Sequence, residues 1–141
     1  MKEYPRLYVD FLHYFNVERD YYECHEVLEE LWLEEGRDPF WQGLLQVAVA
    51  LHHHRNGNLN GARKLFAAAL DKLGRFPEAV RAGIDLAEVK RESTRRLDEL
   101  LHATEGSSPA YEPFEIRILD EELRRLVTER KSRPPEEHDG E

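Results

Sequence analysis

The chain has 141 residues, a length typical of one domain, and its apolar fraction of 40% is enough to form a core. Its net charge of −9 argues against sequence-independent nucleic-acid binding, which needs a basic face, although a local basic patch is compatible with it. No apolar run approaches the roughly 20 residues that span a bilayer, and no apolar signal region follows the first residues. A single cysteine, Cys24, fits a reducing compartment, so we expect a cytoplasmic protein that does not bind membranes.

Five stretches have the apolar spacing that is typical of amphipathic helices. Asn16 is expected to end the first helix, and Gly36 and Gly74 stand where the second and fourth helices stop. Asp38 followed by Pro39 is typical of a helix start. The third stretch is apolar nearly all round, which predicts a central, buried helix. The main helices are expected over about residues 4–15, 20–35, 39–54, 59–73 and 85–101.

The start of the fifth helix is indicated by two independent signals. Asp85 and Glu88 have the spacing of a capping box. Ile84 and Val89 stand at the positions of a hydrophobic staple. Before this start, a short helical turn is expected through Ala82.

The helical pattern has no competing strand pattern. We therefore predict an all-α fold, a compact antiparallel bundle of about five main helices built from stacked α-hairpins. A C-terminal docking segment follows, because Phe114, Ile116 and Ile118 alternate as in extended chain and a short last helix comes after them. The expected organisation is a helical bundle over residues 1–104, an extension packing on it over 105–131, and a disordered acidic tail over 132–141.

A candidate site is centred on His25 and Glu29, which are four residues apart and so lie on the same side of a helix. This spacing suits joint coordination of a divalent metal ion, or a carboxylate that orients an imidazole. A metal site needs a third and usually a fourth ligand, for which His53 and Gln46 on the central helix are the candidates. The sequence thus predicts a buried cluster with metal ligands His25, Glu29 and His53 and with Trp32 and Gln46 lining the same pocket.

Two details limit this interpretation. His52 and His54 project about 100° to either side of His53, so at most one of the three histidines can point into the same pocket. His25-Glu26-x-x-Glu29 differs from a zinc-protease motif, which needs histidine at the fifth position. Since Glu26 also faces away from the apolar stripe, we reject a protease.

Three other interpretations of the cluster remain open. In the first it is a purely structural network, and His25→Ala should then destabilise the fold by roughly 2–4 kcal/mol. In the second the protein is an interaction module with an exposed apolar groove, because Ala62-x-x-x-Phe66 resembles part of a tetratricopeptide unit. In the third His25 and Glu29 form an acid–base pair of an enzyme, although no nucleophile, phosphate loop or cofactor motif accompanies them.

The motif His-x-x-x-Glu-x-x-Trp, present here as His25, Glu29 and Trp32, resembles the mark of an uncharacterised bacterial and archaeal family, domain of unknown function 309. The aromatic first helix, the run from Gln46 to Ala50 and the turn with Arg55, Gly57 and Asn58 are also similar. The likeness covers roughly residues 8–101. It implies an all-helical bundle and metal binding at the motif, and it implies no substrate.

Overall fold

Helices make up most of the computed structural model, which describes residues 4–104 and 106–132 of the chain. One two-stranded antiparallel sheet accompanies them in this described part. The elements in chain order are α1 (Arg6–His13), the π-helix η1 (Tyr14–Glu18), α2 (Tyr21–Glu34), α3 (Pro39–Arg55), α4 (Leu59–Leu73), β1 (Val80–Arg81), β2 (Ile84–Asp85), α5 (Leu86–Leu101) and α6 (Glu121–Ser132). The predicted all-α fold is confirmed.

Side-chain caps fix where five of the helices begin. Asp20 accepts a hydrogen bond from the backbone N–H of Glu23, and Asp38 accepts one from Phe40. Asp85 accepts from the N–H of Glu88, which is half of the predicted capping box. Each cap satisfies a backbone donor that has no partner inside the helix. At the start of α4, Asn58 accepts from the N–H of Gly61, and at the start of α6, Asp120 accepts from that of Leu123.

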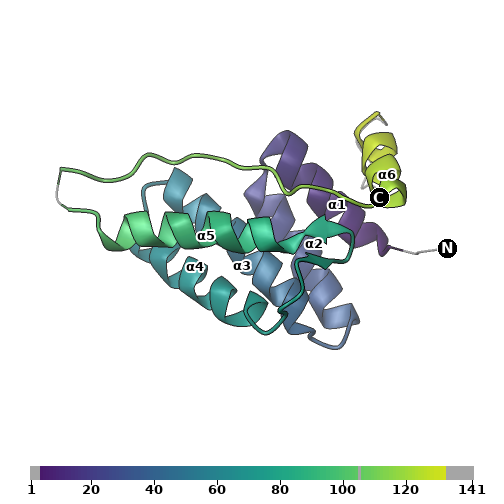
Figure 1. Cartoon of the computed structure of the whole chain (residues 1–141). Helices are drawn as coiled ribbons and strands as arrows, with labels where there is room; N and C mark the ends of the chain where they lie inside the picture. The colour runs from purple at the N-terminus through teal and green to yellow at the C-terminus, as the bar shows by residue number, and fades with distance from the viewer. Residues whose placement is uncertain (1–3, 105, 133–141) are drawn as a thin grey trace.

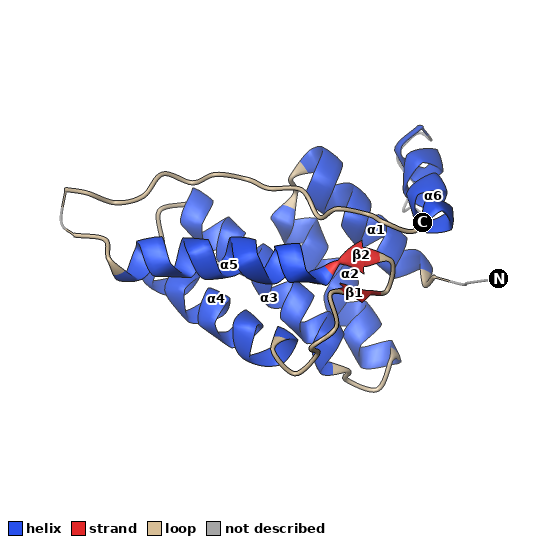
Figure 2. Ribbon diagram, in the orientation of Figure 1, coloured by secondary structure: helices blue, strands red, loops and turns tan. Residues whose placement is uncertain are grey.

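The bundle is built around α3, which packs against α2 on one side and α4 on the other. Further contacts join α4 to α5 and α1 to α2, so consecutive helices from α1 to α5 are neighbours in space, whereas α6 packs against α1. Figures 1 and 2 show this arrangement, with the small sheet at one end of α5. The side chains of Tyr8, Phe11, Phe15, Leu28, Leu44 and Phe66 lie fully buried in one continuous core. No helix in the described part of the chain is long and apolar enough to cross a membrane.

Two local predictions are wrong. The turn through Ala82 is not helical, because Ala82 and Gly83 both have positive φ, 51° and 79°, and form the tight turn of the β1–β2 hairpin. The first helix continues past Asn16 as η1 and ends at Glu18, because the next residue, Arg19, has a φ of 54°. Asn16 does not end it, because its side chain bonds instead to the backbone of Ile116, at 2.9 and 2.8 Å.

Beyond α5 the chain crosses the bundle as an extended segment, which we call the strap (residues 109–118), and leads into α6 (Figures 1 and 2). Arg130 of α6 forms an ion pair with Asp10 of α1 at 2.9 Å. The division of the chain at residue 104 stays a prediction. The predicted tail over 132–141 lies outside the described residues except for Ser132, the last residue of α6.

Replacing Ser93 by alanine is expected to stabilise the protein. Ser93 of α5 is fully buried, and its hydroxyl oxygen has no hydrogen-bond partner. An unpaired buried polar group is destabilising, and alanine also has the higher helix propensity. Ser93→Ala should therefore raise the free energy of unfolding by about 0.5–1.5 kcal/mol in urea denaturation. A lower midpoint would contradict the absence of a partner for this hydroxyl.

Candidate functional site

His25 and Glu29 lie on the solvent-facing side of α2, with 38% and 51% of their side chains exposed. The expectation of a buried cluster is therefore wrong for this pair. The cause is helical phase, since His25 is about 60° around the helix from Leu28, at the edge of the buried stripe, and Glu29 is about 100° away. Both side chains can be reached by a ligand from solvent.

The imidazole of His25 lies between two carboxylates. Its Nε2 is 3.7 Å from Oε1 of Glu29, and its Nδ1 is 3.6 Å from Oε2 of Glu26. Both separations are longer than a hydrogen bond. Two ligands that are each about 2.0–2.2 Å from a tetrahedral zinc ion are roughly 3.4 Å apart, so the His25–Glu29 gap is close to what an ion between them requires.

The three histidines near the end of α3 have different environments. His54 is buried, and its Nε2 donates to the carbonyl oxygen of Pro109 at 2.9 Å. His53 lies toward the start of α4, and its Nδ1 is 3.3 Å from the side-chain nitrogen Nδ2 of Asn58. The pKa of His52 is lowered, first by burial and then by the charges of Arg55 and His53, with a smaller contribution from His25.

The predicted ligand His53 therefore lies beside Asn58 at the start of α4. Among residues 4–104 and 106–132, no three His, Cys, Asp or Glu side chains gather in a way that could hold a metal ion. The structure brings His25 and Glu29 together but does not add His53 to them. Any ion at this pair would have two protein ligands.

The two other predicted pocket residues, Trp32 and Gln46, are half-buried. The indole Nε1 of Trp32 and Oε1 of Gln46 are enclosed and have no hydrogen-bond partner, and the same holds for Nδ1 of His52. The guanidinium of Arg37 lies 5.1 Å from the centre of the Trp32 ring. Sequence reasoning missed His52, a half-buried residue of α3, and Arg37, an exposed residue of the turn between α2 and α3.

Comparisons with known proteins identify the family. The profile of the family described as Domain of unknown function (DUF309) matches residues 8–65. "Uncharacterized protein YpuF" of Bacillus subtilis (strain 168) is 35% identical over 123 residues, which is 85% of this chain and 68% of that protein. The chain belongs to the DUF309 family. The DUF309 match contains His25, Glu29, Trp32, Gln46 and His53.

A second relative of this DUF309 protein is longer. An "Uncharacterized protein" of Aquifex aeolicus (strain VF5) is 31% identical over 101 residues, 70% of this chain and 29% of that protein. The chain thus spans just over two thirds of the Bacillus relative and less than a third of the Aquifex relative.

Cys24 has no accessible chemistry in this DUF309 protein. It is fully buried beside His25 in sequence, and its Sγ donates to the carbonyl oxygen of Phe11 at 3.8 Å. Burial raises the pKa of the thiol, and the nearby carboxylates of Asp20 and Glu23 raise it further. A buried thiol with a raised pKa is a poor nucleophile and metal ligand.

The interaction-module interpretation required an exposed apolar groove. The exposed large apolar side chains of the described residues are dispersed. Two lie near opposite ends of α2, and the others lie on different elements: Val17, Tyr22, Leu33, Val80, Leu101 and Leu119. Single exposed apolar side chains are ordinary on a protein surface. The tetratricopeptide-like groove stays a prediction.

Proposed function

We propose that this DUF309 protein is a small helical binding protein that holds a divalent metal ion at His25 and Glu29 on the surface of α2. The observation that carries the proposal is the pair itself, an accessible imidazole and carboxylate on adjacent turns, 3.7 Å apart, with no hydrogen bond between them. A metal ion needs a gap of this kind between its ligands, and imidazole and carboxylate both suit zinc.

The neighbouring groups support the same assignment. Histidines that bind metals usually direct their second nitrogen to a carboxylate, and Glu26 is placed near Nδ1 of His25 at 3.6 Å. With two protein ligands, the remaining positions on the ion are open to water or to an oxygen-bearing small ligand. We expect exchangeable binding rather than a closed structural site. A cytoplasmic location is part of the proposal, because the single cysteine is free.

Thermal unfolding of protein without a histidine tag tests the metal site. Added zinc should raise the melting temperature, since a ligand that binds only the folded state at 100 times its Kd adds about 2.7 kcal/mol of stability. His25→Ala should abolish this increase while changing the metal-free stability by less than about 1 kcal/mol, because His25 is half-exposed.

The matched control is His102→Ala. His102 also lies in an i,i+4 pair with a carboxylate, with Nδ1 3.4 Å from Oδ1 of Asp98, but this Nδ1 donates to the backbone carbonyl oxygen of Asp98 at 2.8 Å and so is not available to an ion between the pair. The zinc effect should survive in this variant. The metal proposal fails if zinc, nickel and manganese all leave the wild-type melting temperature unchanged, or if His25→Ala retains the full increase. A loss of 2–4 kcal/mol without metal would favour the structural network instead.

A further inference from the structure

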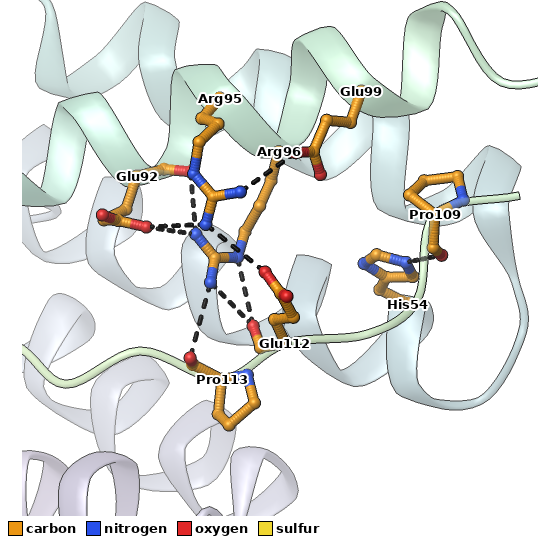
Figure 3. Close-up of polar contacts among 8 residues, drawn as sticks. All are labelled: His54, Glu92, Arg95, Arg96, Glu99, Pro109, Glu112 and Pro113. Atoms are coloured by element: carbon orange, nitrogen blue, oxygen red, sulfur yellow. Dashed lines mark hydrogen bonds and ion pairs between the residues drawn. The ribbon is translucent and has the colours of Figure 1, made fainter.

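The strap is held mainly through its backbone, as a separate extended peptide would be. His54 donates to the carbonyl oxygen of Pro109, and Arg96 donates to that of Glu112 from Nη2 at 2.8 Å and from Nε at 3.2 Å. Figure 3 shows Arg96 reaching from α5 to Glu112 and Pro113 of the strap, and His54 bonded to Pro109, where the strap begins. Further along, Asn16 bonds both the N–H and the carbonyl oxygen of Ile116. Side chains of three separate elements therefore bind the strap's peptide groups.

Two aromatic side chains of the strap add contacts to this backbone recognition. The Tyr111 hydroxyl is 2.7 Å from that of Tyr21 on α2. The ring of Phe114 packs edge-on against Phe15 at 5.4 Å, and the guanidinium of Arg96 lies 4.8 Å from its centre. A bundle face that contacts both backbone and spaced aromatic rings has the features of a peptide-recognition surface.

The same path is lined by arginines, although the protein as a whole carries a net charge of −9. Arg95 lies 3.6 Å from the carboxylate of Glu112, and Arg19 lies 3.6 Å from that of Glu115. Arg55 stands 5.8 Å from the Tyr111 ring. With Arg96 these residues form the arginine track, Arg19, Arg55, Arg95 and Arg96. Two of them pair with the two carboxylates of the strap, and Arg95 and Arg96 also pair with Glu92 of α5.

The connection between α5 and the strap makes local hydrogen bonds. Ser107 donates from its backbone N–H to Thr104 at 2.9 Å, and Ala103 donates back to Leu100 at 3.3 Å. Residues 106–108 are exposed. The contacts that hold the strap thus come from the bundle rather than from this connection, so another copy of the bundle could make every one of them.

From these observations we infer that the arginine track of one copy binds the strap of a second copy, in a dimer that exchanges the strap and α6 reciprocally. Exchange keeps every contact and is opposed mainly by the entropy of association. The connection holds the strap near its own bundle at a high effective concentration, so the dimer should form at high protein concentration. This inference is independent of any ligand at His25.

Cross-linking between two variants of the full chain, each with one introduced cysteine, tests the exchange. Arg95→Cys is placed in one copy and Glu112→Cys in another, because these side chains approach within 3.6 Å across the strap. A short bismaleimide should join the two copies into a covalent heterodimer whose yield rises with protein concentration. Cys24 is buried, so the engineered thiols are the reactive ones. The matched control replaces Arg95→Cys by Lys64→Cys, exposed on α4, and should give only background product.

Shortening the connection provides a second measurement. Deleting residues 106–108 removes about 10 Å of reach, which disfavours closure onto the same bundle. The dimer fraction in light scattering should increase several-fold, and the cross-link between positions 95 and 112 should increase with it. The inference is overturned if both chain lengths give background heterodimer while a double variant cross-links within one chain. It is also overturned if the shortened chain stays monomeric and binds an added peptide of residues 109–118, which would assign the track to a separate peptide.

Discussion

Replacing Arg96 by methionine is expected to destabilise the protein by about 3 kcal/mol, because it removes one partner of a largely buried ion pair. Only 3% of the Arg96 side chain is exposed, and its Nη1 lies 2.5 Å from Oε1 of Glu92. The substitution also leaves the carbonyl oxygen of Glu112 without its donor. Methionine keeps much of the volume, so the loss should come from polar contacts rather than from a cavity.

Urea denaturation of the Arg96→Met variant measures this loss, and Arg95→Met is the matched control. Arg95 is adjacent on α5 and also pairs with Glu92, but 46% of its side chain is exposed. Its removal should cost less than about 1 kcal/mol. Equal effects of the two substitutions would contradict the role of Arg96 in holding the strap.

The effect of Arg96 should also depend on pH. Arg96 is the main cause of a lowered pKa of the Glu92 carboxyl, with Arg95 adding to it. A carboxyl whose folded-state pKa is lowered stabilises the protein above its unfolded pKa, and this contribution is lost as pH falls through the folded value. The difference between wild type and Arg96→Met should therefore be full at neutral pH and become smaller in acid.

Gly83→Ala is expected to destabilise the protein by about 2–4 kcal/mol, from backbone strain and overpacking together. Gly83 has a φ of 79°, which disfavours any residue with a Cβ. A Cβ here would lie 2.8 Å from the Tyr4 hydroxyl and 2.9 Å from Cδ2 of Leu123. The Gly83 carbonyl also accepts from the N–H groups of Leu119 and Asp120, so the strain falls where α6 docks.

Gly57→Ala separates these two causes. Gly57 has a nearly identical φ of 81°, but nothing lies within 4 Å of the position of its Cβ. Its substitution should cost only the backbone strain, about 1 kcal/mol. Thermal denaturation of both variants should show the larger decrease for Gly83→Ala. A similar decrease in both would mean that the contacts at Gly83 relax freely.

Helix ends were predictable because their determinants are local. Asp38 with Pro39, and Asp85 with Glu88, act through atoms within four residues, and the structure confirms both starts. Asn16 misled the prediction, because its partner Ile116 is 100 residues away. The hairpin turn at Ala82 required an alanine in the left-handed region, which sequence preference does not favour.

The position of the candidate site along the helices was predictable, but the direction in which its side chains point was not. Antiparallel packing places His25 about level with the later turns of α3, so a histidine there was a reasonable neighbour. Which of the three consecutive histidines turns to α2 depends on the rotation of α3, and that rotation is set by packing. Gly43 allows close approach of Leu73 from α4, since a Cβ at Gly43 would lie 2.6 Å from Cδ2 of Leu73. A contact between residues so far apart in the chain cannot be predicted from the local sequence pattern of either helix.

The imidazole NMR signals of the untagged protein, followed during a zinc titration, test the central proposal most directly. The ring signals of His25 should shift first and saturate, and Glu29→Gln should strongly weaken this response. His53 and His102 should respond only at higher zinc concentrations. A metal site at His25 and Glu29 would be contradicted by His25 signals that stay unchanged throughout the titration, or by an unaltered response in the Glu29→Gln variant.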